Sequence, residues 1–329
     1  MSMDKPDDNC SFQEWFSAMA SVNLRKLSEQ LKAEFEEMQN EVLMPHEHTE
    51  FSKNSFTGRV RYSDIPCLDI SRVKLRFPVD GNDFIHANWV HLRYSPFTFI
   101  ITQAPLEATI SHFWSMVWYE EVSAVVCLTP ITEQNEPNDR PYWPVKPGED
   151  QFIMSGEILL QHLDKIMQDE LQITLLRLVN KSTGESRELY HYMFMNWPDH
   201  ASPTCTHTFL EAMETIEKNS LRENENKKPI NVLEVVKAVR KQRALVVQSF
   251  PQYAFLHWAL LVHMMKKDSN LKSVLEKSCK TICAIREWST DSECMKFAQV
   301  KRKTIFGRFN QRVKGMFSKM SLRKQKKPS

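Results

Sequence analysis

The order of strand-like and helix-like segments between residues 97 and 267 is the feature that most constrains the fold of this chain. Short apolar runs typical of strands alternate there with segments whose apolar side chains recur at helical spacing. We expect strands at 97–104, 124–129, 153–160, 172–180 and 186–196, and helices at 109–121, 205–219, 232–242 and 252–267. Elements in this order predict an α/β (α+β) domain in which a mixed sheet is flanked by helices.

A helix and a mixed segment precede these elements. Residues 12–37 carry apolar side chains at helical spacing and predict an amphipathic helix, whereas residues 59–90 mix alternating apolar positions with turn residues. We therefore divide the chain into three parts. They are an N-terminal extension with a helix (1–24), one domain (25–270) and a basic, partly helical C-terminal extension (271–329).

Composition favours a folded protein with reduced thiols. Of the 329 residues, 42% are hydrophobic, which is enough to bury a substantial core. The 7 cysteines are scattered and odd in number, so they argue against a disulfide framework. No apolar run reaches the length of a membrane span. We expect a soluble, cytoplasmic protein without cofactor or metal, since Cys279, Cys283 and Cys294 lack paired CxxC spacing.

Eight short motifs follow one another in collinear order across the predicted domain. They are RYSDI (61–65), DFIHAN (83–88), TQAPL (102–106), FWSMVW (113–118), YWP (142–144), TGESR (183–187), WPD (197–199) and QSFPQY (248–253). Together they resemble the motifs of classical, non-receptor type protein tyrosine phosphatases, and collinear order makes chance agreement a poor explanation. Phe84, His86 and Ala104 depart from the residues that the family usually has there, which are Tyr, Asn and Gly.

The resemblance implies a fold and a set of site residues. The fold is a twisted mixed sheet flanked by helices. Asp199 corresponds to the general acid, and Gln248 and Gln252 correspond to the glutamines that position the hydrolytic water. Tyr62 corresponds to the side chain that stacks on the phosphotyrosine ring, and Asp64 to the one that holds the peptide backbone.

The narrower likeness is to phosphatase-like proteins of polydnaviruses, the viruses of parasitoid wasps. This likeness implies a viral protein that acts on signalling in the cytoplasm of a host cell. It remains a resemblance carried by the same motifs.

The family's HCxxGxxR loop is missing from this sequence. A cysteine thiolate in that loop attacks phosphorus, and backbone N–H groups with an arginine hold the phosphate. The loop and its helix should follow Ile230, yet Ile230 runs directly into Asn231 and the segment that resembles the next helix. None of the 7 cysteines is followed by arginine six positions later. We therefore expect a domain truncated between residues 230 and 231, with a void where the helix would lie.

Three functions are compatible with this gap. The first is a pseudophosphatase, which is not an enzyme, has no catalytic residues and keeps Asp199, Gln248 and Gln252 as vestiges. Such a protein would modulate phosphotyrosine or host signalling by binding, with Tyr62 and Asp64 as remnants of substrate recognition. The second is an active phosphatase whose catalytic segment is missing from the sequence, and the third is a decaying, non-functional copy.

The C-terminal extension is strongly basic. Residues 301–327 carry 11 Lys or Arg and no acidic residue, and apolar side chains recur there every three or four positions. This pattern predicts an amphipathic helix suited to an anionic membrane surface or an acidic protein groove. A solvated tail or a nuclear-entry signal is the alternative, and nucleic acid is an unlikely partner. The basic residues singled out are Lys301, Arg302, Lys303, Arg308, Arg312, Lys314, Arg323 and Lys324.

Overall fold

A computed structural model describes most of the predicted domain. The described residues are 24–40, 43–78, 80–93, 95–131, 140–153, 157–197, 202–203, 205–219 and 231–267. The chain divides into two units, residues 1–290 and 291–329, and every described residue belongs to the first. The predicted extension before residue 24 and the basic tail therefore lie outside the described residues. Within the described part, no helix combines the length and the apolar character needed to cross a membrane.

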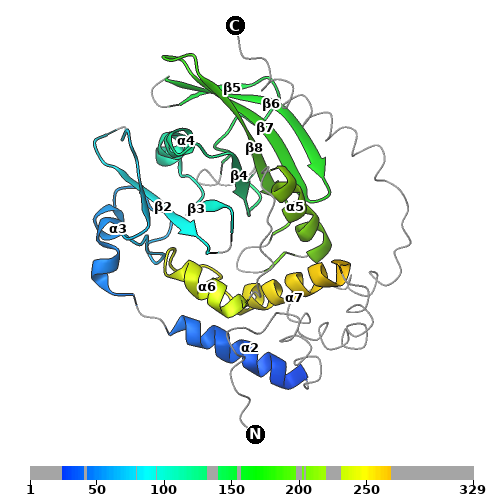
Figure 1. The fold of residues 1–329 in the computed structure, drawn as a ribbon. Helices are drawn as coiled ribbons and strands as arrows, with labels where there is room; N and C mark the ends of the chain where they lie inside the picture. The colour runs from blue at the N-terminus through cyan, green and yellow to red at the C-terminus, as the bar shows by residue number, and fades with distance from the viewer. Residues whose placement is uncertain are drawn as a thin grey trace, which may run out of the picture. The chain divides into compact units, whose positions relative to one another are not determined.

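Helices surround two β-sheets in this domain (Figure 1). The α-helices are α2 (Leu24–Gln39), α3 (Thr49–Asn54), α4 (Ile110–Tyr119), α5 (Thr206–Asn219), α6 (Val232–Arg240) and α7 (Phe250–Lys267), with 3-10 turns η1 (Pro45–Glu47) and η2 (Glu107–Thr109). The strands are β1 (Arg72–Lys74), β2 (Phe84–His91), β3 (Thr98–Thr102), β4 (Ala124–Cys127), β5 (Asp150–Ile153), β6 (Ile158–Gln168), β7 (Leu171–Asn180) and β8 (Ser186–Phe194).

The two sheets differ in pairing. The smaller one has the order β1-β2-β3 and is antiparallel throughout. The larger one has the order β4-β8-β7-β6-β5, in which β4 runs parallel to β8 and every other pair is antiparallel. The expected mixed sheet flanked by helices is therefore confirmed, although the described strands form two sheets.

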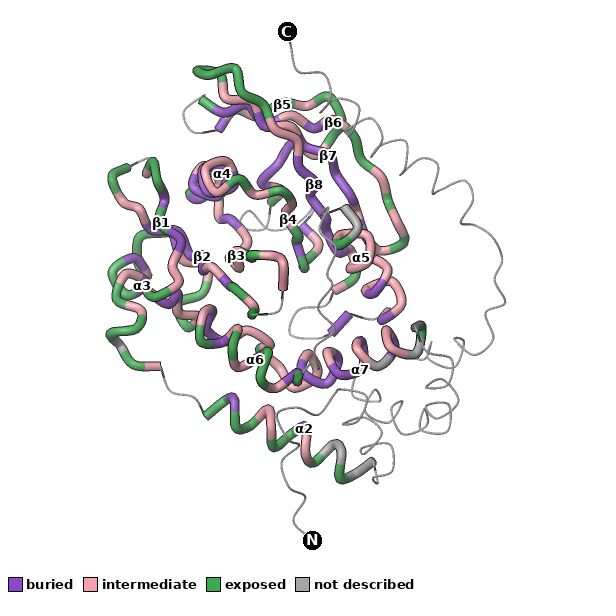
Figure 2. The backbone as a smooth tube through the Cα atoms, in the orientation of Figure 1, coloured by how far each residue is buried: buried purple, intermediate pink, exposed green. Residues whose placement is uncertain are grey.

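Helix α4 supplies the core between the two sheets (Figures 1 and 2). Its Trp114 is fully buried and packs in one cluster with Ile85 of the small sheet and Leu176 of the large sheet. The Trp114 indole Nε1–H donates to the carbonyl oxygen of Tyr142 at 2.7 Å, so the polar edge of the ring is satisfied. The FWSMVW and YWP motifs thus meet in the centre of the molecule.

The arginine of the TGESR motif, Arg187, contacts the end of α4. Arg187 Nη2 donates to the carbonyl oxygens of Val117 and Trp118 at 3.0 and 2.7 Å. These carbonyls lie in the last turn of α4, where they also accept from the backbone N–H groups of Val122 and Glu121 at 3.1 and 3.3 Å. The Arg187 guanidinium also lies 4.8 Å from the centre of the Trp118 ring, a cation–π contact. One side chain on β8 therefore ties the last turn of α4 to the large sheet.

A layer formed by α2, α6 and α7 completes the domain. Leu31 of α2, Val236 of α6 and Tyr253 of α7 are buried in one cluster. The Tyr253 hydroxyl donates to Glu34 Oε2 at 2.7 Å, and Lys237 Nζ lies 2.8 Å from Glu37 Oε1. Helix α2 therefore contacts α6 and α7, the helices after Ile230, through apolar side chains and through polar bonds.

Helix α6 begins where the sequence predicts. Asn231 is its N-cap, with a side chain that accepts from the backbone N–H of Glu234 at 3.3 Å, and α6 begins at Val232. Residues 220–230, which lead into this point, lie outside the described residues. The expected void after Ile230 therefore stays a prediction.

Two strand predictions need correction. The single strand expected at 153–160 consists of the end of β5 and the start of β6, which pair as an antiparallel hairpin. The strand expected to be buried at 124–129 is an edge strand, because among the described residues β4 pairs only with β8. As a result Val126 and Leu128 are 40% and 46% exposed. Apolar runs alone do not distinguish an edge strand from a central one.

Two buried histidines should make the fold acid-sensitive. Burial lowers the pKa of His191 to about 3 and that of His86 to about 4, from an ordinary value of 6.5. The unfolded chain therefore takes up these protons first, and stability present above pH 6.5 is lost as pH falls toward 4. Each pKa unit corresponds to about 1.4 kcal/mol, so we expect each histidine to cost about 2 kcal/mol between pH 6.5 and 5.

Urea unfolding at pH 7.5 and pH 5 measures this loss. His191→Phe should lose about 2 kcal/mol less than the unmodified protein over that interval, since it has no imidazole to protonate. His46→Gln at an exposed position is the matched control and should behave like the unmodified protein. Equal losses in all three proteins would contradict the assignment to His191.

Candidate functional site

The residues between α3 and β1 form an anchored loop, which we call the Tyr62 loop (residues 59–66). The Gln103 side chain pairs with it like a strand, since its Oε1 accepts from Arg61 N at 2.9 Å and its Nε2 donates to Arg59 O at 3.0 Å. Within the loop, Ile65 N donates to Tyr62 O at 3.3 Å and closes a turn. This turn leaves Tyr62 58% exposed.

Arg61 fastens the same loop to the TQAPL motif. Its guanidinium donates from Nε to Ala104 O and from Nη2 to Pro105 O, both at 3.1 Å. Two of its N–H groups are thus directed at backbone carbonyls, and its side chain holds the loop against the segment after β3. The neighbouring Tyr62 and Asp64 are exposed and belong to the same turn, while their roles in recognition stay predictions.

His86 on β2 holds the other end of the Tyr62 loop. Its Nε2 lies 2.8 Å from Ile65 O, and its Nδ1 lies 3.0 Å from Arg243 Nη2. A carbonyl oxygen only accepts and a guanidinium only donates, so His86 is the neutral imidazole with its proton on Nε2. Burial is the main reason that the pKa of His86 falls to about 4, and the charge of Arg243 lowers it further.

Arg243 is a buried cation with neutral hydrogen-bond partners. It is 5% exposed, and its Nη1 donates to Asn88 Oδ1 at 2.8 Å. The thiol of Cys67 lies 3.5 Å from the same oxygen. Burial raises the pKa of Cys67 and outweighs the nearby charge of Arg243, which lowers it. Cys67 is therefore a neutral packing residue and not an activated thiolate.

Gln242, which precedes Arg243 in the chain, extends the hydrogen-bond ladder of the small sheet. Its Oε1 accepts from His91 N at 2.8 Å and its Nε2 donates to His91 O at 3.1 Å. The Ser71 hydroxyl donates to the backbone carbonyl of Gln242. We call residues 241–249 the α6–α7 segment. Gln242 and Arg243 together dock this segment on β2.

The α6–α7 segment contains backbone that only special surroundings tolerate. Leu245 and Val247 have φ values of 59° and 58°, in the left-handed region that residues other than glycine rarely adopt. Arg240 holds this backbone, because its Nε and Nη2 donate to Val246 O and Val247 O, each at 2.9 Å. Its Nη1 also donates to Met38 O in α2 at 2.7 Å.

The two predicted glutamines lie at the start of α7 with different surroundings. Gln252 Oε1 accepts from Gln248 N at 2.8 Å and from Ser249 N at 3.3 Å, so it caps the helix. Gln248 is exposed, and its backbone carbonyl accepts from Gln39 Nε2 at 3.3 Å. Their roles as remnants that position water stay predictions, and so does that of Asp199, which lies outside the described residues.

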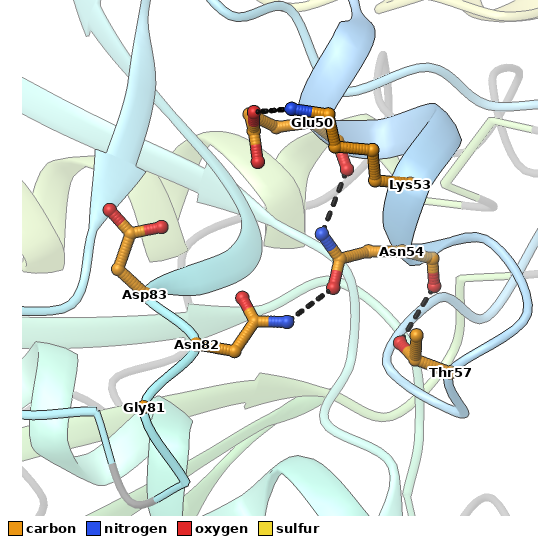
Figure 3. A pocket seen from close by; sticks show the side chains of 7 residues that line it. All are labelled: Glu50, Lys53, Asn54, Thr57, Gly81, Asn82 and Asp83. Atoms are coloured by element: carbon orange, nitrogen blue, oxygen red, sulfur yellow. Dashed lines mark hydrogen bonds and ion pairs between the residues drawn. The ribbon is translucent and has the colours of Figure 1, made fainter.

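The structure also has an open polar pocket of about 500 Å³ (Figure 3). Its lining residues bond to one another: Asn54 Nδ2 donates to the backbone carbonyl of Glu50 at 2.9 Å, and Asn82 Nδ2 donates to Asn54 Oδ1 at 2.7 Å. Lys53 Nζ pairs with Glu50 Oε1 at 2.7 Å. None of the predicted site residues lines it, and these bonds account for its polarity without a ligand. The lining residues are Glu50, Lys53, Asn54, Thr57, Gly81, Asn82 and Asp83.

The structure brings together residues that the sequence did not assign. His86, Gln103 and Arg243 fix the Tyr62 loop, yet no role was predicted for them. The one sequence signal for a special role of His86 was that the family usually has asparagine at this position. Its significance depends on Arg243, which lies 157 positions away. Among the described residues, no group of three His, Cys, Asp or Glu is placed to hold a metal ion.

Comparisons with known proteins agree with the motifs. The family model "Protein-tyrosine phosphatase" matches residues 57–230 and 219–262. Human receptor-type tyrosine-protein phosphatase eta is 28% identical over 303 residues, which cover 83% of this chain and 21% of that protein. Putative receptor-type tyrosine-protein phosphatase mosPTP-1 of Aedes aegypti is 29% identical, covering 73% and 21%. Rat tyrosine-protein phosphatase non-receptor type 2 is 29% identical, covering 69% and 61%.

These matches correct one expectation. We expected a protein that is not an enzyme, because the HCxxGxxR loop is missing. The family match, however, covers sequence on both sides of Ile230, and the relatives are named as tyrosine-protein phosphatases. The chain spans about a fifth of the receptor-type relatives and 61% of the non-receptor relative, and none of them tests the expected viral origin. The chain belongs to the protein-tyrosine phosphatase family.

Proposed function

We propose that this chain binds phosphotyrosine-containing segments of signalling proteins through the Tyr62 loop. The observation that carries the proposal is an aromatic side chain, 58% exposed, on a loop that Gln103, Arg61 and His86 fix at both ends. A fixed loop loses little conformational entropy when it binds, so its contacts contribute to affinity. Offset or edge-to-face contact between two aromatic rings contributes about 0.5–1.5 kcal/mol beyond the buried area.

The chemistry of the loop suggests how such a segment is read. Asp64 is exposed beside Tyr62, and its carboxylate suits the backbone N–H groups of an extended peptide. Arg61 directs its guanidinium at Ala104 O and Pro105 O, so it supports the loop from behind. The Tyr62 loop therefore recognises the ring and the backbone of the bound segment.

A second candidate function is the hydrolysis of phosphotyrosine. The family match and the names of the relatives, all tyrosine-protein phosphatases, favour it. Under this candidate, a segment that supplies the phosphate-binding loop is missing from the sequence between residues 228 and 232. Transcript sequencing across these residues is the direct check, since an added segment with cysteine and arginine would supply the missing groups.

The cellular setting extends the same proposal. By resemblance to the polydnavirus proteins, the chain acts in the cytoplasm of a host cell and modulates phosphotyrosine signalling there. The basic tail adds a second contact, with an anionic membrane surface or an acidic partner. Lys301, Arg302 and Lys303 begin this basic stretch, which lies outside the described residues.

Replacing Tyr62 should weaken peptide binding without unfolding the domain. We expect Tyr62→Ala to raise the Kd for a fluorescent phosphotyrosine peptide about tenfold, which corresponds to about 1.4 kcal/mol of lost ring contact. Tyr62→Phe keeps the ring and should stay close to the unmodified protein. Phe56→Ala is the matched control, because Phe56 is an aromatic side chain that is 96% exposed outside the loop. An equal loss in Phe56→Ala would refute a role for the Tyr62 loop.

Hydrolysis is tested on the same protein with a chromogenic aryl phosphate. The second candidate function predicts turnover that vanadate abolishes, because vanadate occupies the phosphate site as an anion. Turnover that resists vanadate, or none at all at micromolar enzyme, would count against it. Unphosphorylated peptide in the binding assay shows whether the phosphate contributes to recognition.

The tail should bind acidic membranes through charge. We expect the full chain to sediment with vesicles that contain phosphatidylserine, and binding to fall as salt rises, because each basic residue near the surface contributes about 1 kcal/mol. Arg323→Gln together with Lys324→Gln should reduce sedimentation. Equal binding to neutral vesicles would remove the electrostatic explanation.

A further inference from the structure

We propose that His86 is a positioning residue that fixes the Tyr62 loop to the α6–α7 segment, so that both act as one recognition surface. This inference rests on the proposed function of the Tyr62 loop. His86 itself is 2% exposed and touches no ligand, so its effect on binding is indirect.

Each imidazole nitrogen of His86 makes a different hydrogen bond. Nε2 donates to Ile65 O at 2.8 Å, and Ile65 N in turn closes the turn onto Tyr62 O. Nδ1 accepts from Arg243 Nη2 at 3.0 Å. The ring therefore joins the loop that presents Tyr62 to the segment that carries Gln248.

The surroundings fix the ring in this orientation. The Phe51 and Phe84 rings approach it edge-on, with centroid distances of 5.7 and 6.5 Å. Arg243 is also held by Asn88 Oδ1 at 2.8 Å, so the donor that faces His86 is itself immobile. Neither nitrogen can exchange roles, because Ile65 O offers no proton and Arg243 offers no acceptor.

A neutral imidazole suits this position because it offers one donor and one acceptor. A buried guanidinium needs acceptors for its N–H groups, and an unsatisfied buried group is unfavourable. His86 supplies an acceptor toward Arg243 and a donor toward the loop within one rigid ring. A carboxylate would lack the donor, and an ammonium would lack the acceptor.

Two variants separate the two bonds. The amide of asparagine lies one bond beyond Cγ, as Nδ1 does, so His86→Asn keeps an acceptor for Arg243 and loses the bond to Ile65 O. The amide nitrogen of glutamine lies two bonds beyond Cγ, as Nε2 does, so His86→Gln keeps the bond to Ile65 O. Both variants are polar and smaller than or similar to histidine, which makes them matched controls for each other.

Hydrogen exchange of the Ile65 amide is the first measurement. We expect exchange about tenfold faster in His86→Asn and little changed in His86→Gln, since one hydrogen bond contributes about this much. The Kd for the phosphotyrosine peptide should follow the same order, with about a tenfold increase in His86→Asn and less than about twofold in His86→Gln. Equal exchange in the two variants would overturn the proposal.

Imidazole nitrogen NMR on the unmodified protein tests the proposal without a variant. The expected signal is the tautomer protonated on Nε2, and a proton on Nδ1 would overturn the assignment even if a variant fails to fold. The exchange measurement needs no ligand. If the unmodified chain binds no phosphotyrosine peptide, the proposed function of the Tyr62 loop fails while the exchange pattern still decides the positioning role of His86.

Discussion

The buried guanidinium of Arg243 is the contact on which the candidate site depends. It is buried, with Asn88 and His86 as neutral acceptors. Removing a charge from water is unfavourable unless its hydrogen bonds are satisfied, so these acceptors and the guanidinium hold one another in place. Through His86, the same contact reaches the loop that presents Tyr62. A single charge therefore links the helical layer, the small sheet and the exposed aromatic side chain.

A thiol beside this cation shows which effect prevails in the interior. Cys67 lies near Arg243, and a positive charge favours the thiolate. Burial opposes it, because the thiolate would lose its hydration, and the pKa of Cys67 rises. Proximity to an arginine thus does not identify a nucleophile unless the phosphate-binding backbone and solvent access are also present.

Sequence patterns predicted the elements of this fold better than the contacts of its site. Apolar periodicity located β7 and α7, since side-chain burial repeats with the backbone period. The hairpin between β5 and β6 was missed because the apolar end of β5 (Ile153) and the apolar start of β6 (Ile158) lie only a few positions apart in the sequence. Tyr62 and Asp64 were found as motif residues. The roles of His86 and Gln103 depend on partners far along the chain, which periodicity does not encode.

The missing loop also shows how a local motif and a whole-domain comparison answer different questions. A motif search tests for particular residues, and the HCxxGxxR residues do not follow Ile230 in this sequence. A family model compares the whole domain, and it matches the sequence on both sides of Ile230. The scaffold persists because its contacts are distributed. Arg240 holds the strained backbone at Val247, and Arg243 and Gln242 dock the same segment on β2. These bonds join elements that are distant in sequence, so α2 and β2 hold the segment after α6 in place.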